Sequence, residues 1–181
     1  LGLVQPNIGL LTDLIACPGG DFCSLANARA IPIAAALTEL YQDIDEVTDL
    51  GPIDLHISGC INSCGHHHSG HIGILGVDKD GKEWYQVSLG GSDGSALSGD
   101  AVPGKVVGPS FGALEVPGVI EAVLDTFRQQ RAGSETFIDC FKRVGMDPFK
   151  AAANSARLAD KHEDLHALPK KDGYAKDAQE A

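Results

Sequence analysis

The chain has 181 residues, of which 43% are hydrophobic and 22% charged, a balance typical of a folded globular domain. This composition excludes a mostly disordered chain, a collagen-like chain and a coiled coil, and the sequence has no apolar run of about 18 residues that would predict a membrane span. A formal net charge of −11 argues against general nucleic-acid binding, because neutralising phosphates requires a surplus of Lys and Arg.

The start of the sequence indicates a piece of a longer polypeptide. The chain begins at Leu1, its only methionine is Met146, and the apolar start lacks the charged segment and cleavage site of a signal peptide. We expect one folded domain over residues 1–150. Residues 151–181 are polar with mixed charges, which predicts a poorly ordered tail.

The first third of the chain predicts strand, helix and loop in turn. Residues 3–16 are typical of one or two buried strands. Residues 24–42 are rich in Ala and Leu and predict a helical stretch that Pro32 interrupts. Residues 43–52 are acidic and predict a loop, and the alternation of apolar and polar residues over 53–58 predicts a strand.

The remainder predicts a hairpin followed by two helices. Residues 71–77 and 83–89 read as strands joined by a clear turn, and residues 90–104 as a loop rich in Gly, Ser and Asp. Apolar residues then recur at helical spacing over 116–127 and again over 137–144. This alternation of strands and helices predicts an α+β or α/β layered domain.

Four of the five cysteines form two close pairs. Cys17 and Cys23 enclose five residues, Cys60 and Cys64 enclose three, and Cys140 stands apart in an apolar helical pattern that indicates a core thiol. Two pairs on loops are typical of a four-thiolate site for zinc or an iron–sulfur cluster, and the five-residue gap favours the cluster. Unrelated buried thiols are the alternative. The odd count without an export signal favours a reducing compartment, which we interpret as the cytoplasm.

The residues around the two pairs favour an anionic group. Gly19 and Gly20 precede Cys23, and Gly59 and Gly65 flank the second pair. Glycine adopts positive φ readily and lets backbone N–H groups approach an anion, although ordinary turns would need the same residues. The segment after Cys23 predicts a helix start, which would place this thiolate at a helix N-terminus.

The spacing Cys-x5-Cys followed at a distance by Cys-x3-Cys resembles the sirohaem-dependent sulfite and nitrite reductases. The local matches are Ile57-Ser58-Gly59-Cys60-Ile61-Asn62-Ser63-Cys64-Gly65, then His66-His67, Trp84-Tyr85-Gln86 and Leu89-Gly90-Gly91. A proline often stands in that family where this chain has Ile61, a position that is not a ligand. The resemblance covers residues 1 to about 150 and implies an α+β fold, a mixed sheet with packed helices, forming the C-terminal half of a pseudo-symmetric haemoprotein.

The resemblance also implies the cofactors. It implies that Cys17, Cys23, Cys60 and Cys64 ligate a 4Fe–4S cluster, and that Cys64 additionally bridges to the axial face of the sirohaem iron. The implied reaction is the six-electron reduction of sulfite to sulfide, or of nitrite to ammonia. The implied partners are the anionic substrate, a ferredoxin or flavoprotein electron donor, and the N-terminal half of the same polypeptide.

A few polar residues near the cysteines are further candidates for cofactor binding. Arg29 is a candidate to bind a sirohaem carboxylate, with an exposed helical Arg as the alternative. Asn62 and the run His66-His67-His68 are candidates to line the cofactor. The alternatives are that Asn62 only shapes the turn and that the histidines are solvated or cap a helix. Together with His71 the run is also weak evidence for a metal site. No catalytic residue is identified, because the cations that bind the anion are expected in the missing half.

Several functions therefore stay open at this point. The His66-His67 loop and the hairpin at Trp84 favour the sulfite-reducing branch, and nitrite reduction is the alternative. A four-cysteine zinc module that stabilises an interaction domain is an alternative of another class, and a cluster protein without sirohaem is a third. We expect this piece to be inactive alone.

Overall fold

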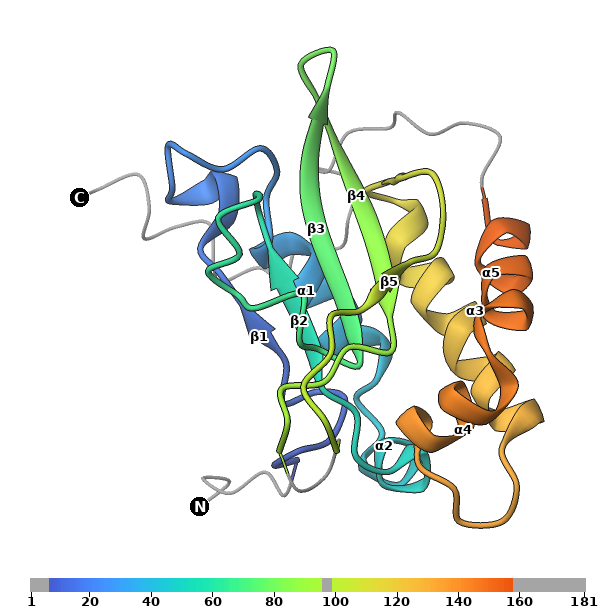
Figure 1. Cartoon of the computed structure of the whole chain (residues 1–181). Helices are drawn as coiled ribbons and strands as arrows, with labels where there is room; N and C mark the ends of the chain where they lie inside the picture. Colours follow the sequence, from blue (N-terminus) through green and yellow to red (C-terminus); the bar gives the residue numbers. More distant parts are fainter. Residues whose placement is uncertain (1–6, 96–98, 158–181) are drawn as a thin grey trace, which may run out of the picture.

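The computed structural model describes residues 7–95 and 99–157, which form a mixed sheet packed against helices (Figure 1). The strands are β1 (Ile15–Ala16), β2 (Leu55–Ser58), β3 (Ile72–Lys79), β4 (Lys82–Leu89), β5 (Lys105–Val106) and β6 (Phe111–Gly112). The helices are the short 3₁₀ helix η1 (Gly19–Asp21), α1 (Ile31–Leu40), α2 (Ile44–Leu50), α3 (Glu115–Gln130), α4 (Phe137–Val144) and α5 (Met146–Ser155).

The sheet is parallel at one end and antiparallel at the other. Its strands follow the order β1-β2-β3-β4-β5, and β6 pairs with β4 beside β5. The pairs β1–β2 and β2–β3 are parallel, whereas β4 runs antiparallel to β3, β5 and β6. The predicted α+β fold with a mixed sheet is therefore confirmed.

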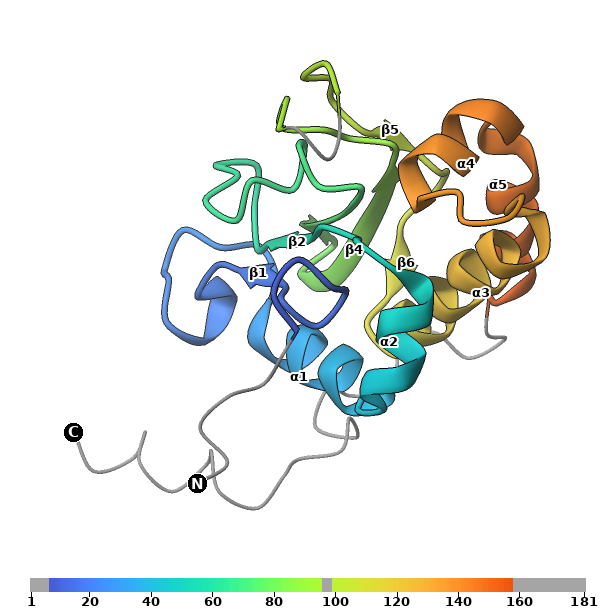
Figure 2. The same cartoon turned by 90° about the horizontal axis from the view of Figure 1, so that it is seen from below.

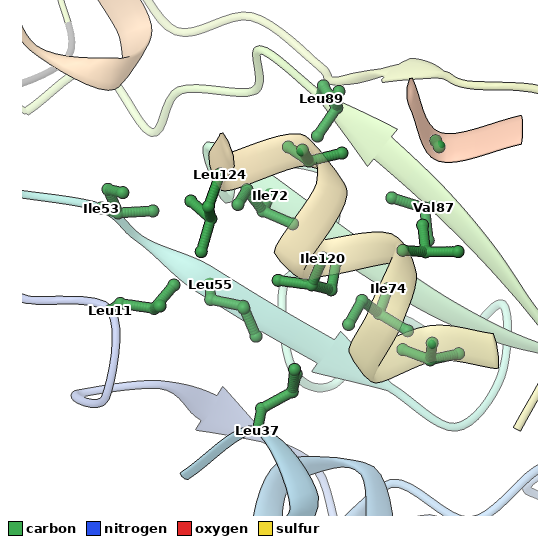
Figure 3. Close-up of a cluster of buried hydrophobic side chains, with 14 of the residues drawn as sticks. Leu11, Leu37, Ile53, Leu55, Ile72, Ile74, Val87, Leu89, Ile120 and Leu124 are labelled. Atoms are coloured by element: carbon green, nitrogen blue, oxygen red, sulfur yellow. The ribbon is translucent and has the colours of Figure 1, made fainter. Parts of the chain in front are cut away.

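The core lies between the central strands and two helices. Ile120 and Leu124 of α3 pack over Ile72 and Ile74 of β3, as Figure 3 shows, and Leu37 of α1 reaches the same cluster. All of these side chains are almost completely buried. Removing so much apolar surface from water is the main source of stability for such a layer, and it fixes the strands that carry the loops described below.

The strong periodic signals in the sequence are confirmed. The strands expected at 53–58, 71–77 and 83–89 are β2, β3 and β4, and the two helices expected after residue 115 are α3 and α4. The turn between β3 and β4 contains Asp80 and Gly81, both with positive φ, and the hairpin projects beyond the rest of the sheet (Figure 1).

Two predictions in the first third are wrong. Residues 24–30 are not helical, and α1 begins only at Ile31 with Pro32 in its first turn, where a missing N–H costs nothing. Cys23 therefore does not lie at a helix N-terminus. The segment expected to be an acidic loop is helix α2, which Asp43 caps by accepting a hydrogen bond from the backbone N–H of Asp45 at 2.9 Å.

The predicted ends of the domain also need correction. Within the expected strand region 3–16, residues 1–6 lie outside the described residues, residues 7–14 form turns with a single bridge at Leu10, and only Ile15–Ala16 is strand. Helix α5 continues to Ser155 and buries Ala153, so a polar tail cannot begin at residue 151. The tail from residue 158 onward lies outside the described residues. None of the described helices is both long and apolar enough to cross a membrane.

Candidate metal centre

The two cysteine pairs lie on neighbouring loops at one edge of the sheet. Cys17 directly follows β1, and Cys60 follows β2 after one residue. Because β1 and β2 are parallel, their carboxyl ends meet at the same edge, which is where open sheets commonly bind ligands. Both Figure 1 and Figure 2 show the two loops side by side, on the side of the molecule away from α4 and α5.

A hydrogen bond to sulfur joins the two loops directly. The backbone N–H of Gly59 donates to the sulfur of Cys17 at 3.0 Å, and the N–H of Cys17 donates to the carbonyl of Ile57 at 3.0 Å. The first cysteine of one pair is thus fixed against the residue that precedes the other pair.

The carbonyl of Gly59 joins the loops a second time. It accepts hydrogen bonds from the N–H groups of Asn27 and Ala28 at 2.9 and 3.0 Å, and the N–H of Gly20 donates to the carbonyl of Ala28 at 3.0 Å. The segment after Cys23 therefore bonds to the loop after β2 instead of forming its own helix. These long-range bonds explain why the expected helix is absent there.

Glycine is needed at two positions for different reasons. Gly19 has a φ of +60°, and a Cβ there would collide with the backbone nitrogen of Ala30. At Gly59 a Cβ would lie 2.6 Å from the carbonyl oxygen of Ala28 and 2.8 Å from the Cα of Gly19. The expected positive φ is confirmed at Gly19, whereas Gly59 is required by the close approach of the two loops.

The four paired cysteines differ in exposure. Cys60 is buried, Cys17 and Cys23 are half-buried, and the side chain of Cys64 is exposed. Cys140 is fully buried in α4, which confirms it as a core thiol. The loops therefore cover three of the four cysteines to different degrees and leave Cys64 exposed.

The thiols do not converge on a point that a single ion could occupy. Among residues 7–95 and 99–157, no three His, Cys, Asp or Glu side chains are grouped to hold one metal ion. Four thiols on two hydrogen-bonded loops are a donor set of the kind that holds an iron–sulfur cluster. The histidine run forms no single-ion site either.

Arg29 lies beside the cysteine loops but is neither helical nor fully exposed. Its Nε donates to the Oε1 of Glu83 at 3.3 Å, and the hydroxyl of Tyr85 donates to its carbonyl at 2.8 Å. The alternative of an exposed helical Arg is therefore wrong, because β4 holds this residue at both its backbone and its side chain. Burial raises the pKa of the nearby Asp21, an effect that the charge of Arg29 opposes.

The other polar candidates divide into exposed and buried residues. Asn62 is exposed in the turn between Cys60 and Cys64, and His66 and His68 are exposed as well. His67 is only 2% exposed, and the hydroxyl of Ser63 shares a hydrogen bond of 3.1 Å with its Nδ1. Burial lowers the pKa of His67 to about 4, so the ring is neutral near neutral pH.

His71 is also buried, whereas the alternative of solvated histidines concerned His66, His67 and His68, of which only His67 is buried. Its Nδ1 accepts a hydrogen bond from the backbone N–H of Asp54 at 3.2 Å, and its Nε2 lies 3.6 Å from the carboxylate of the same residue. Burial lowers its pKa, against the opposing charge of Asp54. His71 therefore ties the start of β3 to the segment before β2.

Sequence reasoning missed two residues that support the site. The hydroxyl of Ser58 accepts a hydrogen bond from the N–H of Gly65 at 3.1 Å and so closes the loop of the second pair onto the end of β2. Tyr85 holds Arg29 from β4, as described above. Both residues lie in segments that resemble the reductases, which was the available signal, but the sequence does not show the contacts that they make.

Comparison with known families gives a match over most of the chain. Residues 10–161 match the family described as the nitrite and sulphite reductase 4Fe-4S domain. The matched segment includes both cysteine pairs and all the described helices. The cluster named in that description agrees with the donor set on the two loops.

Similar characterised proteins carry the names of both kinds of reductase. A sulfite reductase [ferredoxin] 2 of Mycolicibacterium paratuberculosis is 32% identical over 83% of this chain and 28% of its own length. An assimilatory ferredoxin-dependent nitrite reductase of Haloferax mediterranei is 31% identical over 74% of this chain and 23% of its own. A sulfite reductase [NADPH] hemoprotein beta-component of Bacillus pumilus is 30% identical over 78% of this chain and 24% of its own length. The chain spans about a quarter of the length of these relatives.

Solved structures of similar proteins agree with the fold. The Mycobacterium tuberculosis NirA protein aligns with a TM-score of 0.60 and 30% sequence identity, covering 75% of this chain and 26% of that chain. Dissimilatory sulfite reductase I aligns with a TM-score of 0.65 over 87% of this chain and 56% of that chain, at 14% identity, which shows a shared fold alone. From its family match, its relatives and its paired cysteine loops, the chain belongs to the nitrite and sulphite reductase 4Fe-4S domain family.

Proposed function

We propose that this chain supplies the cluster-binding part of a sirohaem-dependent reductase that converts sulfite to sulfide. Cys17, Cys23, Cys60 and Cys64 would hold the 4Fe–4S cluster, and Cys64 would also bind the sirohaem iron. The observation that carries this proposal is the joining of the two cysteine loops by the hydrogen bond from Gly59 to the sulfur of Cys17. When bound, the two cofactors supply electrons one at a time to an anion at the haem iron.

The exposure of the four sulfurs supports these separate roles. Cys60 is buried, which suits a thiolate that contacts only the cluster and keeps water away from it. Cys64 is exposed, which suits a sulfur that must also reach a group lying outside this chain. The N–H of Gly59 supplies a donor for sulfur without adding a charged side chain.

Charge indicates what the rest of the enzyme must contribute. Between Cys17 and Cys64 the sequence has one Lys or Arg, Arg29, and its side chain already pairs with Glu83. An anionic substrate and a macrocycle with several carboxylates need more cations than this. We propose that other parts of the same polypeptide supply them, with Arg29 and Asn62 contributing contacts to the macrocycle from this side.

The choice of sulfite over nitrite depends on the local sequence, because alignment length does not separate the two. The relatives named as sulfite reductases align over 162, 145 and 135 residues, and the nitrite reductase of Haloferax mediterranei aligns over 138. The His66-His67 loop resembles the sulfite-reducing branch. The relatives are named for ferredoxin and for NADPH, and we propose a ferredoxin or flavoprotein as the donor here.

Anaerobic loading of the chain with iron and sulfide tests the cluster. We expect about four iron and four labile sulfide per chain, with visible cluster absorption. One zinc per chain without visible absorption would overturn the proposal in favour of a zinc-stabilised module. The substrate is tested with the full-length, sirohaem-loaded polypeptide, reduced methyl viologen and each anion in turn. Faster turnover of nitrite than of sulfite would make nitrite the proposed substrate.

A further inference from the structure

The turn that carries Cys64 adopts a backbone conformation that side chains normally disfavour. Ser63 and His66 both have positive φ, +56° and +54°, and they lie on either side of Cys64 and Gly65. The left-handed region brings Cβ close to the following carbonyl oxygen in residues other than glycine. Such a conformation persists only where surrounding contacts enforce it.

Hydrogen bonds enforce it on both sides of Cys64. The N–H of Ser63 donates to the carbonyl of Cys60 at 3.1 Å, and the Ser63 hydroxyl bonds to the Nδ1 of His67 at 3.1 Å. On the other side, the N–H of Gly65 donates to the hydroxyl of Ser58 at 3.1 Å. The backbone of Cys64 is therefore fixed although its side chain is exposed.

The burial of His67 lowers the stability of the fold, which indicates that its hydrogen bond to Ser63 has a role. The ring is 2% exposed, and its Nε2 is buried without a hydrogen-bond partner among the described residues. A buried polar atom without a partner lowers stability, and an apolar side chain of similar size would avoid that cost. Within residues 7–95 and 99–157, the bond from Nδ1 to Ser63 is the one hydrogen bond that this ring makes.

We propose that His67 is a positioning residue for Cys64, which acts through Ser63 to hold the exposed thiol in one orientation before iron is bound. This inference rests on the proposed cluster site and goes beyond it, because it assigns a role to a residue that is not a ligand. A fixed thiol loses less conformational freedom when it binds iron, so the bound cluster is lost more slowly.

Two substitutions at residue 67 separate the hydrogen bond from packing. His67→Asn places an amide group near the position of Nδ1 but leaves space, whereas His67→Phe fills the space without a hydrogen bond. Ser63→Ala removes the hydroxyl that bonds to His67, and the alanine must adopt the same positive φ as Ser63. Ser69→Ala is the matched control, because it removes a serine hydroxyl bonded to the carbonyl of His66 at 3.1 Å in the same loop.

The measurement is the rate at which the anaerobically loaded chain loses iron to a chelator, together with the electron paramagnetic resonance spectrum of the reduced cluster. We expect iron loss about three- to tenfold faster in Ser63→Ala and His67→Phe, with the same spectral change in both. His67→Asn and Ser69→Ala should stay near the parent. The double variant Ser63→Ala/His67→Phe should lose iron no faster than either single variant.

Different failures have different meanings. Fast iron loss in His67→Asn with parental behaviour in His67→Phe would show that packing matters and overturn the inference. Parental behaviour in every variant would overturn it as well, while leaving the cluster site intact. If both variants at residue 67 fail to fold, the rate of iron loss from Ser63→Ala tests the inference, and a parental rate would overturn it. A parent chain that takes up no cluster would overturn the proposed function, and this inference with it.

Discussion

The backbone N–H of Gly59 lies 3.0 Å from the sulfur of Cys17, and this contact connects two loops that are 42 residues apart in the sequence. It exists because β1 and β2 are parallel neighbours, with Ala16 opposite Ile57. One residue further along, the chain of β1 leaves the sheet at Cys17, whereas β2 continues to Ser58 and leaves the sheet at Gly59. The register of a two-residue strand therefore sets how the loops that carry the two cysteine pairs lie against each other.

Gly59→Ala should separate the two loops. The added Cβ would lie 2.6 Å from the carbonyl oxygen of Ala28, a backbone atom that cannot move without displacing the hydrogen bonds around it. We expect iron and labile sulfide per chain to fall to less than about half of the parent value, while the helical circular dichroism signal persists. Iron analysis after anaerobic loading measures the effect.

Gly118→Ala is the matched control for this glycine. Gly118 lies exposed in α3 with no atom within 4 Å of an added Cβ, so alanine should fit and raise helix stability by about 0.5–1 kcal/mol. Full cluster content in Gly118→Ala is required for a loss in Gly59→Ala to be assigned to the loops. Full cluster content in both variants would mean that close loop contact is unnecessary.

Substitution of two of the proposed ligand cysteines should affect the two proposed cofactors differently. Cys64 is exposed and Cys17 is half-buried with its sulfur bonded to Gly59. In the sirohaem-loaded enzyme we expect Cys64→Ser to disturb both the cluster content and the sirohaem absorption, and Cys17→Ser to lower mainly the cluster content. A normal sirohaem spectrum with full activity in Cys64→Ser would contradict its bridging role.

Local periodicity was enough to predict the central part of the fold. Strands β3 and β4 and helices α3 and α4 have apolar residues at regular spacing, and the structure has them where that spacing placed them. Helix α2 is not predicted from composition, because the acidic residues over 43–52 indicate a loop. Its buried Val47 and Leu50, behind the capping Asp43, are at helical spacing and were the available signal.

The two cysteine pairs can be recognised from their spacing in the sequence, whereas the contacts that organise their loops cannot. That the four cysteines bind one cluster stays a prediction. The loss of the helix expected after Cys23 depends on N–H groups of Asn27 and Ala28 that bond to the carbonyl of Gly59, far away in the chain. A tertiary interaction of this kind overrides local helix propensity and leaves no local pattern.

Tyr85→Phe should loosen the segment that follows Cys23. The hydroxyl of Tyr85 donates to the carbonyl of Arg29 at 2.8 Å, and its side chain is buried, so removing it should lower the free energy of unfolding by about 1–2 kcal/mol. Urea unfolding followed by circular dichroism measures this loss.

Tyr41→Phe provides a matched control in the same protein. The Tyr41 hydroxyl is buried without a hydrogen-bond partner among the described residues, so its removal should leave stability unchanged or raise it by up to about 1 kcal/mol. An equal loss of stability in both tyrosine variants would mean that the hydroxyl contact to Arg29 contributes nothing specific.

Glu135 should make stability depend on pH in the acid range. Its carboxylate accepts hydrogen bonds from Arg143 at 2.6 and 2.8 Å and from the N–H of Ala132 at 3.0 Å. The hydrogen bonds from Arg143 come first among the causes that hold the pKa of Glu135 at about 2, below its ordinary value of 4.5. As the pH falls, the Glu135 carboxylate is protonated in the unfolded chain before it is protonated in the folded chain. The stabilisation that its charge gives to the fold is therefore lost as the pH falls from 4.5 to about 2.

Glu135→Gln tests this sign directly. The variant should be less stable than the parent near neutral pH, and the difference between their urea midpoints should shrink steadily below a pH of about 4.5. A cluster that is lost in acid is lost from both proteins, so it cancels in the difference. Arg143→Gln should show the same pH dependence, because it removes the cationic partner of the Arg143–Glu135 ion pair. A difference that stays constant down to a pH of about 3 would mean that the charge of Glu135 does not stabilise the fold.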